Sequence, residues 1–304
     1  MADLPVDRLE TVPPFTYCGV DLFGPWLIKE GDTSSFINAL RRFVSIRGPV
    51  RHLRCDQGTN FVGAEGEFTK AMSELDFDRI RQYLLEQNCD FVQFKMNVPS
   101  ASHMGGVWER QIRSVRNILS TLLCQLGTQL DDESLRTLMS EATAIVNSRP
   151  LTLENLNDPL SVEPLTPNHL LTMKSKVFLP PPGNFMKNDV YSRKRWRRVQ
   201  FLANEFWSRW RKEFLSNIQS RQKWIAPKRN LSVGDIVMIK DDNLVRNMWR
   251  LGRICKTFID DDNLVRKVRL AVGSTNLDRR GVRKSKLTEL ERPIHKLVLL
   301  QETE

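Results

Sequence analysis

The chain has 304 residues, of which 46 are Lys or Arg and 36 are Asp or Glu, so its formal net charge is +10. This length allows about two domains, and no apolar stretch approaches the length that spans a membrane. The five cysteines are odd in number and far apart, which argues against a disulfide framework. Residues 1–5 lack the basic and apolar regions of a signal peptide, so we expect a cytoplasmic or nuclear protein.

The positive charge is concentrated in one segment. Between Tyr191 and Arg229, 12 basic residues stand against two acidic ones, a net charge of +10. A compact positive segment is typical of proteins that bind a polyanion, and DNA is favoured over a membrane because no apolar anchor accompanies it. The alternative is a charged surface that serves only solubility.

Short strands and amphipathic helices alternate in the first half of the chain, which indicates an α/β fold. After Thr33, apolar residues at helical spacing predict a helix that stops at Gly48-Pro49. A long helix is expected after a loop that ends at Gly105-Gly106, with an apolar stripe from Trp108 to Leu122. The other expected elements are strands at 17–22, 50–55 and 90–94, a helical segment at 67–88 and a helix at 132–147. We predict one compact domain over residues 10–148.

Three segments are expected in the second half. Seven of the 15 prolines lie between Pro150 and Pro182, so residues 149–190 are predicted to be a semi-rigid connector without regular structure that packs partly on the core. Residues 191–229 form a basic helical segment in which packing is favoured over base stacking for Trp196, Phe206 and Trp210. Residues 230–302 are predicted to be a small β-barrel, with strands at 236–240, 249–258, 265–272 and 294–300.

The hexapeptide Asp-Asp-Asn-Leu-Val-Arg occurs twice, at 241–246 and at 261–266. Two copies are too few for a repeat fold. Each copy follows a predicted strand, and aspartate and asparagine are favoured in turns, so we expect both copies to form turns.

Three carboxylates come from separate predicted elements. Asp21 and Asp56 follow the first and second strands, and Glu109 lies near the start of the long helix. If the two strands are parallel neighbours, these acids can meet and bind a divalent cation, Mg²⁺ or Mn²⁺, of the kind that serves phosphoryl transfer. The alternative is that they are ordinary turn and helix acids, with Glu109 paired to Arg113 one turn later.

Several cations are candidates for phosphate contacts. Arg113 and Arg116 share a helix face with Glu109, where a solvated charged face is the alternative. Near the start of the basic segment, Arg193, Lys194, Arg195, Arg197 and Arg198 are expected to have no packing role. Five cations in six residues predict a salt-sensitive contact with DNA, and a nuclear import signal is the competing use.

The motifs Asp21-Leu-Phe-Gly-Pro, Asp56-Gln-Gly-Thr-Asn-Phe and Gly-Gly-Val-Trp-Glu109 resemble the integrase core of long-terminal-repeat retrotransposons, most closely the BEL/Pao group. The resemblance continues at Asn147-Ser-Arg-Pro-Leu, Thr166-Pro-Asn-His-Leu, Gly234-Asp-Ile-Val-Met-Ile and Trp249-Arg-Leu-Gly-Arg. It therefore extends over nearly the whole chain.

The resemblance implies a ribonuclease H-like core followed by a basic helix and a small SH3-like β-barrel. It also implies that Asp21, Asp56 and Glu109 bind Mg²⁺ for DNA strand transfer, that Gln57 and Asn60 shape the site against DNA, and that the chain acts as a homo-oligomer. The family has two further strands after the first aspartate, but only residues 22–32 separate Asp21 from Thr33. We therefore expect a core that lacks two strands, and the alternative function is a DNA-binding remnant without catalytic activity.

Overall fold

The computed structural model of the chain describes residues 9–20, 33–48, 50–55, 93–96, 102–125, 130–151, 164–174, 180–191, 193–218, 229–273 and 286–303. The chain divides into two compact units, Met1–Ser120 and Thr121–Glu304, and each is described by itself. No helix within the described ranges is both long and apolar enough to span a bilayer. The predicted segment limits at 148, 190 and 229 stay predictions.

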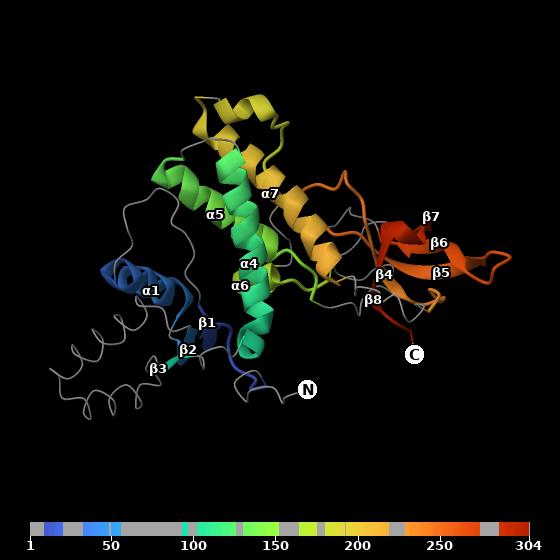
Figure 1. The fold of residues 1–304 in the computed structure, drawn as a ribbon, viewed down its shortest axis with the longest axis horizontal. Helices are drawn as coiled ribbons and strands as arrows, with labels where there is room; N and C mark the ends of the chain where they lie inside the picture. The colour runs from blue at the N-terminus through green and yellow to red at the C-terminus, as the bar shows by residue number, and fades with distance from the viewer. Residues whose placement is uncertain are drawn as a thin grey trace. The chain divides into compact units, whose positions relative to one another are not determined.

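The first unit contains a parallel sheet of three described strands: β1 (Tyr17–Gly19), β2 (His52–Cys55) and β3 (Gln93–Met96), in the order β1-β2-β3 (Figure 1). Cys18 pairs with Leu53, and Leu53 pairs with Phe94. The parallel pairing of the first two strands is therefore confirmed. The described part of the third strand covers 93–96 and overlaps the predicted strand at residues 93 and 94, while residues 90–92 lie outside the described residues.

Helix α1 (Thr33–Arg47) begins and ends where the sequence predicts. Gly48 adopts φ 90° and donates its N–H to the Val44 carbonyl at 2.9 Å. A left-handed residue at this position closes a helix, and glycine adopts it without strain. Phe43 packs edge-to-face on Phe15 with ring centroids 5.4 Å apart, which holds the helix against the segment before β1.

Helix α4 (Ser102–Gln125) begins earlier than predicted. The expected loop up to Gly105-Gly106 is wrong, because both glycines lie inside the helix. Each costs about 1 kcal/mol relative to alanine, but the apolar stripe is long: Ile118, Leu119 and Leu122 are all buried. Burial of this stripe offsets the glycines.

The second unit begins at Thr121, in the last turns of α4, and continues with α5 (Asp132–Val146), whose predicted bounds are confirmed within one residue. Asp131 caps it by accepting a hydrogen bond from the Ser134 N–H at 2.7 Å. Helix α5 packs against α7 (Arg195–Ile218), which begins in the predicted basic segment. Helix α7 is buried on several sides, and Leu202 and Phe206 are fully enclosed.

The connector contains two short helices, α6 (Pro167–Thr172) and the 3₁₀ turn η3 (Lys187–Tyr191), so the prediction of no regular structure is wrong there. Pro167 occupies the first helical turn, where its missing N–H has no cost. Asn168 donates its backbone N–H to the Asn147 carbonyl at 3.0 Å and its side-chain amide to the Ala144 carbonyl at 2.8 Å. These bonds tie the connector to the end of α5, although no residue of α6 is buried, so the expected partial packing on the core stays a prediction.

The second unit ends in a five-stranded antiparallel sheet of order β7-β6-β5-β4-β8. Its strands are β4 (Ile236–Ile239), β5 (Leu251–Ile259), β6 (Val265–Val272), β7 (Thr288–Pro293) and β8 (Leu297–Gln301). The charged strand β7 was not predicted, and the predicted strand at 294–300 divides into the 3₁₀ turn η4 (Ile294–Lys296) and β8.

Both faces of β4 are buried. Val237 and Ile239 enter a core with Ile254, Val268 and Leu270. Ile236 and Met238 face the other way, into a cluster that includes Leu215 of α7. The last turns of α7 therefore cover the opposite face of the sheet, and the sheet and helix share one hydrophobic interior.

Candidate functional site

Two of the three predicted carboxylates, Asp21 and Asp56, follow in the sequence the parallel strands β1 and β2, whose carboxyl ends lie at one edge of the sheet. Gly19 of β1 stands in register with Arg54 of β2. Asp21 and Asp56 themselves lie outside the described residues, as do Gln57 and Asn60. Glu109 is in α4, but its side chain is not described either. Over the described ranges alone, no group of three or more His, Cys, Asp or Glu side chains could hold a metal.

The two arginines predicted beside Glu109 lie on α4. Arg113 and Arg116 are both exposed, three residues apart on a helix. Neighbours at this spacing share a face, so both guanidinium groups are available to an anion that approaches this side of α4.

The five basic residues at the start of α7 differ in their surroundings. Arg193, Lys194 and Arg195 are exposed, whereas Arg197 and Arg198 are partly buried. Arg195 lies 3.1 Å from the Asp131 carboxylate that caps α5. This ion pair is open to solvent on both sides, so it contributes little to stability and leaves Arg195 able to exchange its partner.

Arg197 has a clear packing role, so the expectation that none of these cations has one is wrong. Its guanidinium donates to the Asp189 carboxylate at 2.7 Å and to the Asn184 carbonyl at 2.9 Å. Asp189 raises the pKa of Arg197, and Arg197 in turn lowers the pKa of Asp189. The charged pair fastens η3 to the first turn of α7.

Packing was predicted for three aromatic residues of the basic segment, and the structure separates them. Phe206 and Trp210 are buried, which confirms the prediction for both. Trp196 is 53% exposed, so the prediction is wrong there. The reason is position: Trp196 lies in the first turn of α7, before the stretch that α5 and the sheet cover.

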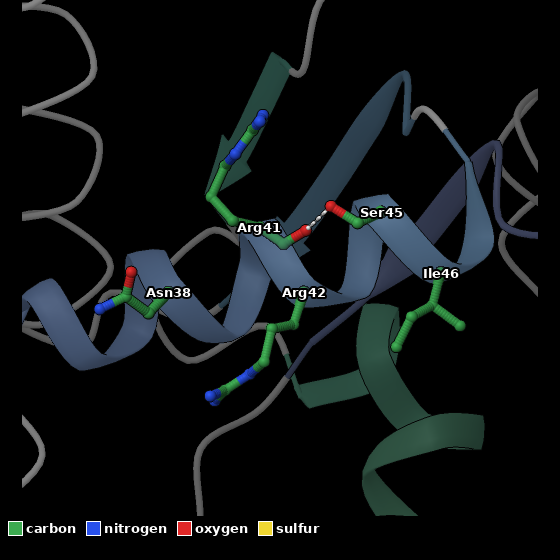
Figure 2. A pocket seen from close by; sticks show the side chains of 5 residues that line it. All are labelled: Asn38, Arg41, Arg42, Ser45 and Ile46. Atoms are coloured by element: carbon green, nitrogen blue, oxygen red, sulfur yellow. Dashed lines mark hydrogen bonds between the residues drawn. The ribbon is translucent and has the colours of Figure 1, made fainter.

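A shallow hollow on α1 is lined by Asn38, Arg41, Arg42, Ser45 and Ile46 (Figure 2). Ser45 donates its hydroxyl to the Arg41 carbonyl at 2.8 Å, which is a bond within the helix. Arg41 and Arg42 are exposed, so the hollow is positively charged, and the sequence did not single it out. It is open and lacks a convergent set of polar groups of the kind that defines a ligand pocket.

A buried charged network joins α5, α7 and the β4–β5 loop, and the sequence did not reveal it. The Arg246 guanidinium donates to the Gln200 side-chain oxygen at 2.6 Å and lies 3.3 Å from the Glu141 carboxylate. Gln200 donates its amide to Glu141 at 2.8 Å. Burial lowers the pKa of Arg246, and Glu141 opposes that change.

The buried Arg211 of α7 makes a second contact with the same loop. It donates to the Asp241 carbonyl and to the Asp242 carboxylate, the latter at 2.8 Å. One sequence signal points to this role: Arg211 follows Trp207 by four residues and precedes Phe214 by three, so it lies on the apolar stripe of the helix.

The two copies of the hexapeptide have different roles. Both form turns as predicted, with the Asp241 carboxylate accepting the Asn243 N–H and the Asp262 carboxylate accepting the Leu264 N–H. The arginines that end the two copies differ, because Arg246 is buried against α5 and α7 while Arg266 is exposed and bonds only acids of its own turn among the described contacts. A role in the turn therefore accounts for the second copy, whereas the first copy also supplies a buried arginine to the helices.

Residues 194–300 match a family described as "Family of unknown function (DUF5641)". The matched residues include all of α7 and the five-stranded sheet except the last residue of β8, about a third of the chain. No curated protein matches the chain.

A solved structure with some similarity is a chain in the cryo-EM structure of the simian T-cell lymphotropic virus intasome in complex with PP2A regulatory subunit B56 gamma. The TM-score is 0.31 and the sequence identity 13%, over 91% of this chain and 67% of that chain. Values this low establish neither a common fold nor a common activity.

Proposed function

We propose that this protein is an integrase of the long-terminal-repeat retrotransposon type, which binds DNA and joins DNA strands with a divalent metal. In this proposal Asp21, Asp56 and Glu109 bind Mg²⁺ or Mn²⁺ in a ribonuclease H-like core. The motif resemblance supports the assignment to this class. The observation that carries the metal site is the parallel register of β1 and β2.

The pairing of β1 with β2 leads us to expect the two aspartates at the same edge of the sheet. Gly19 and Arg54 are paired in the parallel ladder, and Asp21 and Asp56 each follow their paired residue by two positions. Parallel strands leave a sheet at a common edge, and sites in parallel α/β sheets are built at the carboxyl ends of the strands. We therefore expect both acids, which lie outside the described residues, at this edge of the sheet.

The donor set suits a hard cation. Carboxylate oxygens are the ligands that Mg²⁺ and Mn²⁺ prefer, and three acids brought together repel one another until a cation is present. When bound, such a cation activates an attacking oxygen and stabilises the leaving oxygen of a phosphodiester. Arg113 and Arg116 would position the DNA backbone by contacts to phosphates.

The C-terminal sheet supports a small SH3-like barrel in this proposal. Strands β4 to β7 follow one another as a meander, and β8 returns to pair with β4 beside the start of the meander. In this order β7 and β8 are the two edge strands of the described sheet, and a barrel would bring these two edges together.

The second candidate is a DNA-binding remnant without catalytic activity. It is favoured by one observation: among the described strands, β1 lies at the edge of its sheet. The resembled family has two further strands beside this position, and a core that lacks them would be incomplete. The DNA-binding surfaces in the second unit do not depend on that core, so this candidate retains them.

A strand-joining assay tests the proposal. The full chain is incubated with duplex oligonucleotides and Mg²⁺, and joined products are separated by length. We expect joining by the wild type, loss of joining in Asp56→Asn, and wild-type joining in the control Asp261→Asn, which changes an exposed turn acid. DNA binding without joining would favour the remnant, and a chain that binds no DNA would remove both candidates.

A further inference from the structure

We propose that Trp196 is a stacking platform for unpaired DNA bases and that the exposed cations beside it hold the DNA backbone. This inference rests on the proposed function, because it takes DNA as the ligand, and it adds the form of DNA that this surface recognises: single-stranded nucleotides. The surface consists of Phe185, Lys187, Trp196 and the run Arg193–Arg195.

Trp196 is placed unlike the other described tryptophans of its helix. Its side chain is 53% exposed, whereas Trp207 and Trp210 are 4% and 2% exposed. An indole that is open to solvent exposes apolar surface at a cost, and it is one of the side chains best suited to stack on a base.

The indole is held in place by its neighbours. Phe185 meets it edge-to-face with ring centroids 5.6 Å apart. The Arg197 guanidinium lies over both rings, 5.3 Å from the Phe185 centroid and 5.6 Å from the Trp196 centroid. Asp189 and the Asn184 carbonyl fix that guanidinium, so the platform is preorganised. Its side chains would therefore lose little conformational entropy when a base binds.

The surroundings carry the charge that a DNA backbone requires. Residues 185–198 contain six Lys or Arg and one Asp, a net charge of +5. Lys187, Arg193, Lys194 and Arg195 are exposed. An aromatic platform among exposed cations is the combination used by proteins that bind single strands without sequence preference.

Unpaired DNA fits this surface better than a duplex. Inside a duplex both faces of each base are covered by its neighbours, so an exposed indole finds a base face only where bases are unpaired or at an end. Phosphate contacts are common to both forms. The indole should therefore contribute to the affinity for single strands and much less to the affinity for duplex DNA.

A second aromatic in a cationic setting provides a contrast. Phe258 in the sheet has Lys256, Lys267 and Arg269 within 6 Å of its ring centroid. Glu289 and Glu291 pair with Lys267 and Arg269, so two acids balance two of these three cations. It serves as a control, because it also places an aromatic ring among cations but has an excess charge of only +1.

The test measures binding of the full chain to two probes by fluorescence anisotropy: a labelled oligothymidine of about 12 nucleotides, within the usual length for such sites, and a duplex of equal length. Trp196→Leu keeps an apolar side chain without an aromatic face, and Trp196→Tyr keeps the face. We expect Trp196→Leu to weaken oligothymidine binding by about 5- to 100-fold, with duplex binding nearly unchanged. Trp196→Tyr should retain most of the affinity, and Phe258→Leu should bind as the wild type does.

The two failures are distinguishable. If Trp196→Leu binds oligothymidine like the wild type, or loses both probes equally, stacking is overturned while duplex binding by the wild type still supports the proposed function. If the wild type binds neither probe, both proposals fall. Circular dichroism of each variant confirms that α7 is intact.

Discussion

The Arg246 guanidinium lies 3.3 Å from the Glu141 carboxylate, and both side chains are removed from solvent, with exposed fractions of 1% and 12%. Arg246 ends the first copy of the repeated hexapeptide, in the loop between β4 and β5, and Glu141 is on α5. The contact therefore joins the sheet to the helices within the second unit.

Replacement of Arg246 by methionine should destabilise this unit. The apolar side chain keeps much of the volume but leaves the Glu141 carboxylate and the Gln200 amide buried without their cation. Loss of one member of a buried pair costs about 3–5 kcal/mol, and we expect the free energy of unfolding, measured by urea titration, to fall by that order.

The same substitution at Arg266 is the control, since this arginine occupies the same position in the second copy and is exposed. We expect a change of less than about 1 kcal/mol there. The double variant Arg246→Met with Glu141→Gln should recover part of the loss. Equal effects at Arg246 and Arg266 would contradict a buried network.

Asp235 should make stability depend on pH. Burial raises its pKa, but hydrogen bonds from Arg229 and from the Ser232 and Thr303 N–H groups outweigh burial, so the pKa of Asp235 lies below its usual range. Its contribution is therefore complete above the unfolded-state pKa of about 3.9 and is lost as the pH falls through the lower folded-state value.

The variant Asp235→Asn isolates this effect. We expect it to be less stable than the wild type at pH 7, with the difference shrinking as the pH falls below about 4, because the wild type then protonates the same group. Urea titrations over a pH series measure the difference. A gap that stays constant, or widens on acidification, would be inconsistent with a lowered pKa.

The exposed cations at the start of α7 should dominate the salt dependence of DNA binding. Replacing Arg193, Lys194 and Arg195 together by alanine removes up to three phosphate contacts. Each contact contributes roughly 0.9 to the slope of log affinity against log salt concentration, so we expect the slope on duplex DNA to fall by about 2 to 3.

The control pair is Lys267→Ala with Arg269→Ala, whose charges Glu289 and Glu291 already balance. This pair should leave the slope nearly unchanged. If the control lowers the slope as much as the triple variant, the DNA contacts are spread over the sheet and are not concentrated at the start of α7.

The helices with local signals were predictable from the sequence. Thr33, the Gly48-Pro49 stop and the acidic start of α5 set helix ends through contacts within a few residues. Local signals misled at α6, where Pro167 begins a helix that the prolines were expected to exclude. Local signals were absent at β7. Its sequence, Thr-Glu-Leu-Glu-Arg-Pro, has no alternation of apolar and polar residues, which is the pattern that predicts a strand.

The sequence predicted only part of the surface at the start of α7. Clustered cations identified the segment, but the sequence could not show that Arg197 is held by Asp189 while Arg193 is exposed, since this depends on where η3 packs. Nor could it show that Trp196 extends beyond the covered part of the helix. The burial of Arg246 could not be predicted for the same reason. Arg266 ends an identical hexapeptide and is exposed, so only tertiary contacts make the two arginines differ.

The most direct test of the proposed metal site is a double-mutant cycle on Mn²⁺ affinity, followed by the loss of the free-ion electron paramagnetic resonance signal on binding. Asp21→Asn and Asp56→Asn are measured singly and together in the full chain. If both acids bind one metal site at the shared edge of β1 and β2, each single variant should lose at least about tenfold in affinity, and the double variant should lose much less than the product of the two. Wild-type Mn²⁺ affinity in Asp56→Asn, or strictly multiplicative losses, would contradict a common site.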